Sequence, residues 1–184
     1  MILGSHNSMS YLPPLKWWMR PFHFIVKCQD KDIHEQYKCG VRIFDIRIAY
    51  EYTVPCFAHG IIKFKRIGAG VWRTLSTINE FTDCTVRIVL ESNRKEDIKL
   101  FKIDVENYIK TFKNIKFVEG TRKSTWEKLI DIPAYTGLQL VSSMTGTIFD
   151  DWFPRLYAKF NNKKNIAKYK DTDKEVLIDF VGVY

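Results

Sequence analysis

Long apolar runs, paired cysteines and internal repeats are all missing from this sequence of 184 residues. No stretch approaches the ~20 consecutive apolar residues that a membrane-spanning helix needs. Residues 1–25 hold Pro13, Lys16 and Arg20 where a signal peptide would have an apolar segment, so we predict a protein made and kept in the cytoplasm. None of the four cysteines belongs to a C-x-x-C pair, which argues against a zinc site and favours reduced thiols.

Acidic residues are fewer than basic ones: the sequence has 21 Asp and Glu and 29 Lys and Arg, and the net charge is +8 at pH 7. This balance favours an anionic partner, and a phosphate ester, an acidic membrane surface and nucleic acid all qualify. The sequence has no zinc finger, RNP motif or heptad array, so we do not expect nucleic acid as the partner. The length and a hydrophobic content of 46% predict a single domain over residues 1–184.

Strand-like and helix-like patterns alternate along the chain. We predict strands at residues 2–5, 41–50, 55–64, 84–93, 114–120, 137–143 and 175–184, and helices at 30–39, 73–82, 95–112, 124–132 and 147–170, the last in two pieces around Pro154. Such alternation implies a parallel sheet covered by helices. A complete eight-fold barrel needs about 250 residues. We therefore predict an α/β fold in the form of a compact, distorted or incomplete TIM-like (β/α) barrel.

Polar side chains stand at or near the ends of four predicted strands: His6-Asn7, Asp45-x-Arg47, His59-Gly60 and Glu91. The C-terminal ends of barrel strands converge on one face, so these groups are expected to meet. One imidazole can take a proton, the other can give one, and a guanidinium can hold phosphoryl oxygens. Each group alone is more often structural, but the combination in this order suits the cleavage of a phosphodiester.

Three segments, GSHNSMSYL, QYKCGVRIFDIRI and FAHGIIKF, resemble the X-region of phosphatidylinositol-specific phospholipase C and its phosphodiesterase relatives. That family opens with a Gly-x-His-Asn/Asp-Ser/Thr strand, continues with a Gly-x-Arg-x-Phe/Leu-Asp/Glu strand and then has a His-Gly strand. The resemblance is specific over residues 4–64, looser at IVLES and LIDFVG, and absent over residues 95–170. It implies a distorted, incompletely closed barrel.

The resemblance also implies roles for five residues. His6 would be the general base that activates the attacking hydroxyl, and His59 the general acid that protonates the leaving alkoxide. Arg47 would stabilise charge on the phosphoryl oxygens. Asp45 would orient Arg47 or His59, and Asp179 would hold the tautomer of His6. In the phospholipases the attacking group is the inositol 2-hydroxyl, so the products are a cyclic phosphate and diacylglycerol.

Two patterns within this family are mixed in the sequence. Asn7 and Glu91 match the eukaryotic members, which hold calcium, whereas Arg47 matches the bacterial members, in which arginine stands in for the metal. Calcium takes six to eight oxygen ligands, and Arg47 would place a positive charge among them. We therefore predict catalysis without a metal or other cofactor. A calcium site formed by Asn7, Asp45 and Glu91 is the alternative.

In the metal-free interpretation, three residues are candidates for substrate binding. Asn7 would bond to phosphate or to His59, and Glu91 would pair with Arg47 or contact substrate hydroxyls. Ser143, in the SSMTG segment after a predicted strand, would contact phosphate or sugar. The substrate stays open between an inositol phospholipid and a soluble diester such as a glycerophosphodiester, a cyclic phosphate or a nucleotide.

An apolar cluster, WWMRPF at residues 17–22, allows two interpretations. It could form a lip that dips into an anionic membrane surface, but we expect a helix packed on the barrel. The rival to an enzyme is an inactive barrel that binds a phosphorylated ligand or an acidic membrane. Because a decayed site would be expected to lose at least one of His6, His59 and Arg47, their retention favours the enzyme.

Overall fold

The computed structural model describes residues 1–184 except 68, 121–127, 143–151 and 184. The strands are β1 (Ile2–Ser5), β2 (Ile43–Glu51), β3 (Val54–His59), β4 (Ile62–Ile67), β5 (Cys84–Leu90), β6 (Ile115–Glu119), β7 (Leu138–Leu140) and β8 (Glu175–Ile178). The helical segments are η1 (Trp17–Phe22), α1 (His23–Val26), α2 (Ile33–Lys38), α3 (Ala69–Asn79), α4 (Lys95–Thr111) and α6 (Pro154–Tyr169).

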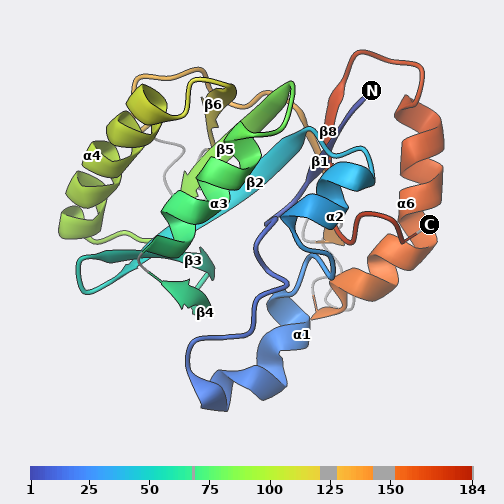
Figure 1. The fold of residues 1–184 in the computed structure, drawn as a ribbon. Helices are drawn as coiled ribbons and strands as arrows, with labels where there is room; N and C mark the ends of the chain where they lie inside the picture. Colours follow the sequence, from blue (N-terminus) through green and yellow to red (C-terminus); the bar gives the residue numbers. More distant parts are fainter. Residues whose placement is uncertain (68, 121–127, 143–151, 184) are drawn as a thin grey trace.

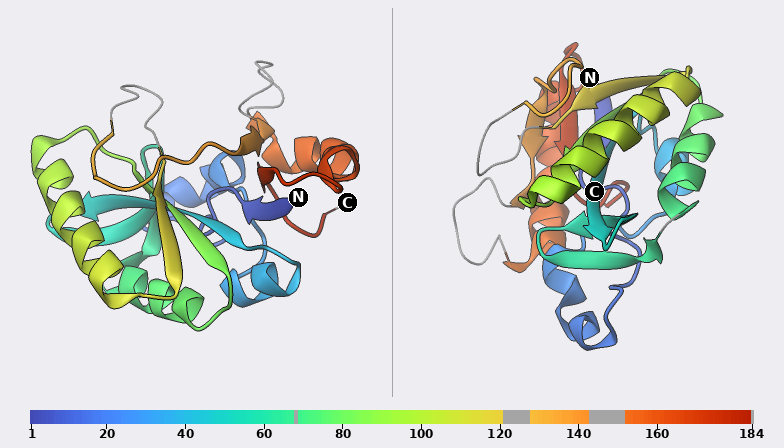
Figure 2. Two further views of the ribbon diagram at one scale, coloured as in Figure 1. Left: turned by 90° about the horizontal axis from the view of Figure 1, so that it is seen from above. Right: turned by 90° about the vertical axis from the view of Figure 1, so that its left-hand side faces the viewer.

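Six strands form a curved parallel sheet in the order β6, β5, β2, β1, β8, β7. Helices α3 and α4 lie toward the β5–β6 side, and α2 and α6 toward the β1–β8 side (Figures 1 and 2). Among the described strands, β6 and β7 are not paired with each other, so the barrel is not closed. The prediction of an incomplete α/β barrel is confirmed.

Strand β1 is short and lies between two close neighbours. Gly4 is opposite Ile43 of β2 on one side and Leu177 of β8 on the other. A Cβ atom at Gly4 would lie 2.4 Å from Leu177 Cδ2 and 3.0 Å from Ile43 Cβ. A larger residue at this position would require the side chains of Leu177 and Ile43 to shift, so glycine lets β1 lie between its neighbours without that adjustment.

The apolar core joins the strands to the inner faces of α3 and α4. Buried residues recur every three or four positions along each helix, as expected for one packed face. The helix residues are Val71, Leu75 and Ile78 of α3 and Phe101 and Val105 of α4. They belong to the same apolar cluster as three side chains of β2, which are Phe44, Ile46 and Ile48. Each such side chain contributes about 1.5–3 kcal/mol to the stability of the fold when it is buried. Strand β2 is therefore held in place by the packing of its apolar face against these helices.

Residues 55–64 are two antiparallel strands, β3 and β4, and not the single strand predicted from the sequence. Strand β3 pairs with the C-terminal half of β2, on the edge that β1 leaves free beyond Phe44. Gly60, with φ of +58°, and Ile61 make the turn between β3 and β4. Apolar residues flank this short turn on both sides, so the sequence pattern resembled one continuous strand.

Two other predicted elements differ from the structure. Residues 128–132 are not helical, so the helix predicted at 124–132 is wrong there, and its expected start lies outside the described residues. The last strand ends at Ile178 and does not run to residue 184, because the chain turns through Phe180, where φ is +49°. Pro154 is the first residue of α6. At this position the N–H of a residue has no partner within the helix, so proline, which lacks an N–H, costs the helix no hydrogen bond.

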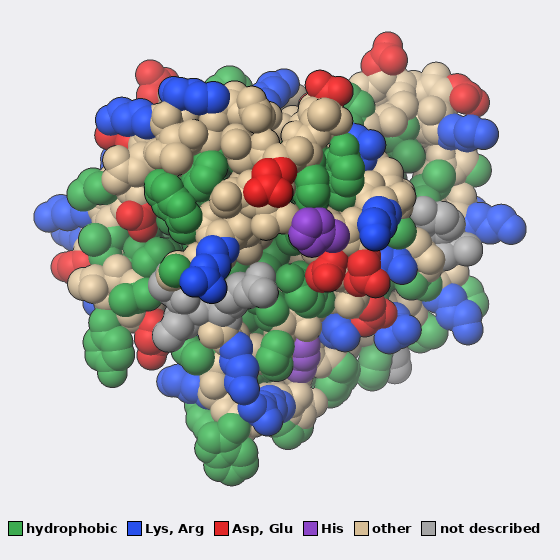
Figure 3. Space-filling view, viewed as in Figure 1, with side chains coloured by type: hydrophobic (Ala, Val, Ile, Leu, Met, Phe, Trp, Pro, Cys, Tyr) green, Lys and Arg blue, Asp and Glu red, His purple; other side chains and the backbone are tan. Residues whose placement is uncertain are grey.

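Segment η1 and helix α1 protrude from the barrel, at the lower end of Figure 1. Trp17 is 76% exposed, Trp18 52% and Phe22 53%, and no residue of η1 or α1 is buried. The expectation that this cluster packs on the barrel is therefore wrong for these three side chains. Figure 3 shows apolar side chains gathered at this tip. No helix in the described part of the chain is long and apolar enough to cross a membrane.

Candidate active site

Neighbouring parallel strands bring four of the polar residues to one place. His6 follows β1, and Asp179 follows β8, the strand beside it. Asp45 and Arg47 lie two residues apart on β2, and alternate residues of a strand point to the same face of the sheet. The register of β1 against β2 places Ser5 opposite Phe44, so His6 stands level with Asp45.

The contacts of His6 fix its tautomer. Arg47 Nη2 lies 2.8 Å from His6 Nε2, and since a guanidinium has only donors, Nε2 must be the acceptor. The hydrogen of the neutral ring is therefore on Nδ1, which donates to Asp179 Oδ1 at 2.7 Å. His6 is buried, with 4% of its surface exposed. The ring is thus held with Nε2, the nitrogen that carries the lone pair, beside Arg47.

Arg47 is part of a chain of ion pairs that extends from β2 to β5. Its Nε donates to Asp45 Oδ2 at 2.9 Å and its Nη1 to Glu91 Oε1 at 2.7 Å. Asp45 Oδ1 in turn accepts from Nη1 of Arg87 at 2.6 Å. Burial alone would raise the pKa of Asp45, but Arg47, Arg87 and His6 hold that pKa well below its usual range.

The pKa of Arg47 also depends on its partners. Burial by itself would lower this pKa, but the carboxylates of Asp45 and Glu91 raise it above the usual range. The guanidinium therefore keeps its charge inside the site. Both carboxylates are needed to balance it, because Arg87 shares Asp45.

His59 reaches the site from the hairpin, as the last residue of β3. Its Nδ1 lies 2.9 Å from the carbonyl oxygen of Val26, so Nδ1 is the donor and Nε2 is left for chemistry. The ring centres of His59 and His6 are 5.7 Å apart. Burial, with the nearby charges of Arg47 and His6, lowers the pKa of His59 to about 4. Without substrate, this imidazole is neutral at neutral pH.

Asn7 follows His6 in a left-handed backbone conformation, with φ of +41°. Its backbone N–H donates to Asp45 Oδ2 at 2.9 Å, which ties the end of β1 to β2. Both polar atoms of its side-chain amide are buried and have no hydrogen-bond partner among the described residues. This buried amide has two donors and an acceptor to offer to a ligand.

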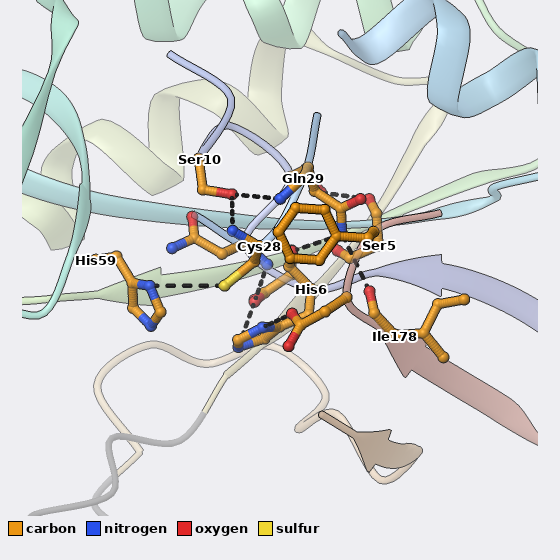
Figure 4. Close-up of polar contacts among 12 residues, drawn as sticks. Ser5, His6, Ser10, Cys28, Gln29, His59 and Ile178 are labelled. Atoms are coloured by element: carbon orange, nitrogen blue, oxygen red, sulfur yellow. Dashed lines mark hydrogen bonds and ion pairs between the residues drawn. The ribbon is translucent and has the colours of Figure 1, made fainter. Parts of the chain in front are cut away.

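A thiol that the sequence did not single out lies between the two histidines. Cys28 Sγ is 3.7 Å from Nδ1 of His59, and Figure 4 shows the sulfur directed at that ring with His6 on its other side. Cys28 is 2% exposed. Burial and the negative charge of Asp179 raise its pKa well above the ordinary value, so the group is a neutral thiol.

Two buried amides outside the predicted set hold the backbone around the site. Gln29 Nε2 donates to the carbonyl oxygens of His6 and Ile178, both at 3.0 Å, and so links β1 to β8 (Figure 4). Asn162, on α6, donates from Nδ2 to the carbonyl oxygen of Asp179 at 2.7 Å. Neither residue carried a sequence signal, because each lies in an unremarkable polar stretch far from the histidines.

His6 and His59 line a cavity of about 510 Å³. Its polar wall is formed by His6, Cys28, His59, Ser142 and Asp179. The rest of its lining is mainly apolar and comes from Met19, Phe22, Ile25, Val26, Ile61, Ile62 and Pro154. Phe22 and Ile61 are exposed, so the cavity has an apolar rim that faces solvent.

The structure brings together all but one of the predicted site residues. His6, Asn7, Asp45, Arg47, His59, Glu91 and Asp179 are joined by the contacts above. Ser143 lies outside the described residues, although its neighbour Ser142 lines the cavity. Arg87 was missed, but a charged residue within the apolar strand CTVRIVL was a signal that could have revealed it.

No protein-family model matches this chain, and no curated protein does. Solved structures are similar to it. Against phosphatidylinositol-specific phospholipase C from Listeria monocytogenes the TM-score is 0.67 at 16% identity, over 97% of this chain and 87% of the other. Against the enzyme of the same name from Staphylococcus aureus it is 0.63 at 15% identity, over 100% and 86%. The chain therefore has the fold of these bacterial phospholipases, and the likeness extends to the described parts of residues 95–170, where the sequence showed no resemblance.

Proposed function

We propose that this chain, which has the fold of the bacterial phosphatidylinositol-specific phospholipases C, is a phosphodiesterase that uses two histidines as acid and base. The observation that carries the proposal is the pair of imidazoles on one cavity wall. His6 and His59 are 5.7 Å apart between ring centres, and Arg47 donates a hydrogen bond to His6. A proton acceptor and a proton donor can then reach two oxygens of a single phosphodiester.

In the first step, His6 acts as the base. Its Nε2 carries the lone pair, because Nδ1–H is held by Asp179, and the hydrogen bond that Nε2 accepts from Arg47 is exchanged for one from the attacking hydroxyl. Nε2 takes the proton of the attacking hydroxyl as the oxygen forms a bond to phosphorus. The imidazolium that results is stabilised by the carboxylate of Asp179, and Arg47 stabilises the charge that develops on the phosphoryl oxygens.

His59 acts as the acid. Its Nδ1–H bond to Val26 leaves Nε2 to carry the catalytic proton. Since the pKa of the free group is about 4, the anionic phosphodiester must raise it on binding, as an opposite charge nearby does. His59 then protonates the leaving alkoxide as its bond to phosphorus breaks. An attacking hydroxyl from the substrate gives a cyclic phosphate, the product of a lyase, whereas water gives hydrolysis.

Catalysis without a metal is part of the proposal. The guanidinium of Arg47 bridges Asp45 and Glu91, two of the three residues of the alternative calcium site. Both oxygens of Asp45 are engaged by arginines and by the N–H of Asn7. A hard cation would need these oxygens, so the residues present do not fit calcium. We propose instead that the unpartnered amide of Asn7 and the carboxylate of Glu91 contact the substrate.

An amphiphilic diester, such as an inositol phospholipid, is the substrate that we favour over a soluble one. The apolar lining of the cavity suits the hydrocarbon part of a lipid, and the exposed side chains of Trp17 and Trp18 lie on η1 beside its rim residue Phe22. Membrane binding is a named property of the similar Staphylococcus aureus enzyme. Peripheral contact with an anionic membrane would bring the cavity to its substrate, and the basic net charge supports it.

The test is turnover of a fluorogenic inositol phosphodiester, in EDTA and in calcium, by the unchanged protein and by His6→Ala and His59→Ala. We expect activity that survives EDTA and falls by roughly 10²–10⁴-fold in each variant. Activity that needs calcium would overturn the metal-free mechanism. No turnover of this diester, of lipid vesicles or of soluble and cyclic diesters would favour an inactive barrel that binds a phosphorylated ligand.

A further inference from the structure

The loop after α1 holds Cys28 in a fixed position at the centre of the site. Ser10 Oγ accepts from the backbone N–H of Cys28 at 2.9 Å and from that of Gln29 at 3.0 Å. The side chain of Gln29 is bonded to β1 and β8, as described above. The thiol is thus as firmly placed as the histidines, although the proposed mechanism does not use it.

Around this sulfur lie three side chains with free or exchangeable lone pairs. The nearest ligand atoms of His6, Cys28 and Asp179 all lie within 4.8 Å of one another, and all three residues are buried. His59 Nδ1 is 3.7 Å from the same sulfur. Asp179 Oδ2 is buried without a hydrogen-bond partner among the described residues, so this carboxylate has an unused acceptor.

We propose that Cys28, His6, His59 and Asp179 form a binding site for zinc or a cation of similar softness. One sulfur, two imidazole nitrogens and one carboxylate are typical ligands of tetrahedral zinc. Zinc–sulfur and zinc–nitrogen bonds of about 2.3 and 2.0 Å separate two ligands on a tetrahedron by about 3.5 Å. The 3.7 Å between Cys28 Sγ and His59 Nδ1 is close to that value. The ligand atoms of His6, Cys28 and Asp179 lie within 4.8 Å of one another, so they must move closer together to complete the tetrahedron.

The charges and the access route also suit zinc. When the ion binds, the thiol loses its proton to solvent, and the thiolate and Asp179 together balance the two positive charges. A buried site without residual charge avoids the cost of an unpaired ion. All four residues line the cavity of about 510 Å³, so an ion can enter from solvent. A sulfur ligand favours zinc over calcium, which takes oxygen ligands.

Binding requires two hydrogen bonds to be exchanged. His6 or Asp179 must give up their mutual bond, and His59 must turn away from Val26 or bind through its Nε2. The ion would then occupy both imidazoles that the proposed function needs as base and acid. A bound ion would therefore inhibit the phosphodiesterase. This consequence rests on the proposed function, but the binding of the ion does not depend on it.

The test uses the metal-free protein with zinc chloride in calorimetry and with Co²⁺ in absorption spectroscopy. We expect one ion per chain and, with Co²⁺, a sulfur-to-metal charge-transfer band of a tetrahedral site. Cys28→Ser and Cys28→Ala should abolish the band and weaken zinc binding by more than about tenfold. Cys84→Ser removes another buried thiol, far along the chain, and should change neither result. Circular dichroism shows whether each variant is folded.

Zinc binding of equal strength in folded Cys28→Ser and Cys28→Ala, or no binding by the unchanged protein, would overturn the site. Phosphodiesterase activity separates this outcome from the proposed function. If zinc binds through Cys28 but no diester is turned over, the metal site stands and the proposed function fails. If a diester is turned over and zinc inhibits the unchanged protein and the cysteine variants alike, the metal site fails and the function stands.

Discussion

At the scale of single residues, Arg47 is the group on which the charges of the site converge. It donates to Asp45, Glu91 and His6 at once. These bonds use three of its five N–H donors, so a phosphoryl group that binds the others brings a negative charge next to the carboxylates. Glu91 is the most accessible, since its side chain is 18% exposed whereas that of Asp45 is fully buried. Glu91 therefore competes with an anionic ligand for Arg47.

Glu91→Gln should strengthen the binding of an anion. A partly exposed ion pair such as Glu91–Arg47 contributes about 0.5–1 kcal/mol. Once Glu91 no longer competes for Arg47, inhibition by inorganic phosphate should be about 2- to 5-fold tighter. Glu91→Asp keeps the charge and is the matched control. Weaker phosphate inhibition in Glu91→Gln would show that the carboxylate assists the anion, for example by holding the guanidinium in place.

The pH dependence of stability should report the environment of His59. Burial and the charges of Arg47 and His6 lower its pKa from 6.5 to about 4 in the folded protein. The unfolded chain then binds more protons between these values. The contribution of neutral His59 is complete above pH 6.5 and is lost as the pH falls toward 4, at most about 1.4 kcal/mol per unit and 3 kcal/mol in total. Water in the cavity reduces this loss, because the ring is only partly buried.

Urea unfolding between pH 4 and 7 in EDTA measures this slope. His59→Asn cannot be protonated and should lose most of the slope in that interval. An equal slope in both proteins would mean that His59 titrates normally in the folded state and that the charge of Arg47 is neutralised by its carboxylates.

At the scale of elements, the pairing of β5 with β2 supports the strand that carries Asp45 and Arg47. Arg87 of β5 lies directly opposite Asp45 of β2 in the parallel register and donates to it at 2.6 Å. Both side chains are buried, with 4% and 0% exposed. The contact of two adjacent strands therefore fixes the carboxylate that orients Arg47.

Arg87→Met should destabilise the fold by about 3–5 kcal/mol, because it leaves Asp45 with one cation fewer in a buried place. Urea unfolding measures the change. The double variant Asp45→Asn with Arg87→Met should lose less than the sum of the two single variants, since their side chains are in contact. Strictly additive losses would show that the two strands are held together without this ion pair.

At the scale of the whole molecule, apolar and basic side chains share one end of the protein. Trp17 and Trp18 are exposed on η1 beside Lys16 and Arg20. The patch continues to α6, because Phe24 of α1 stacks on Phe153 with ring centres 6.0 Å apart. Exposed tryptophans next to cations are typical of a surface that meets anionic lipid headgroups.

Replacement of Trp17 and Trp18 by alanine should weaken binding to vesicles of anionic phospholipid by roughly tenfold or more, from about 1.5–3 kcal/mol for each side chain that the bilayer would bury. Sedimentation with the vesicles measures this. Ile103→Ala removes an exposed apolar side chain from α4 and should leave binding unchanged. Equal binding by all three proteins would remove the argument for a lipid substrate and favour a soluble diester.

The sequence predicted the barrel class, all six parallel strands, the last of them too long, and the residues that meet at their ends. Apolar periodicity is local, so it identifies β2, β5 or α4 whatever they pack against. The hairpin was missed because its two-residue turn at Gly60 lies between apolar segments. The packed position expected for Trp17, Trp18 and Phe22 was also wrong, since nothing local says whether an apolar cluster finds a partner. The cytoplasmic location and the absence of a cofactor stay predictions.

What the sequence determined by itself was the identity of the reactive groups, through the His-Asn, Asp-x-Arg and His-Gly motifs and their order. The tertiary structure decided how these groups are charged and which others join them. Cys28 and Gln29 come to the site from the loop after α1, Arg87 from β5 and Asn162 from α6. The physical reason is that burial and electrostatic coupling depend on distance in space. The lowered pKa of His59 and the polar side chains around Cys28 therefore exist only once β1, β2, β3 and β8 are assembled.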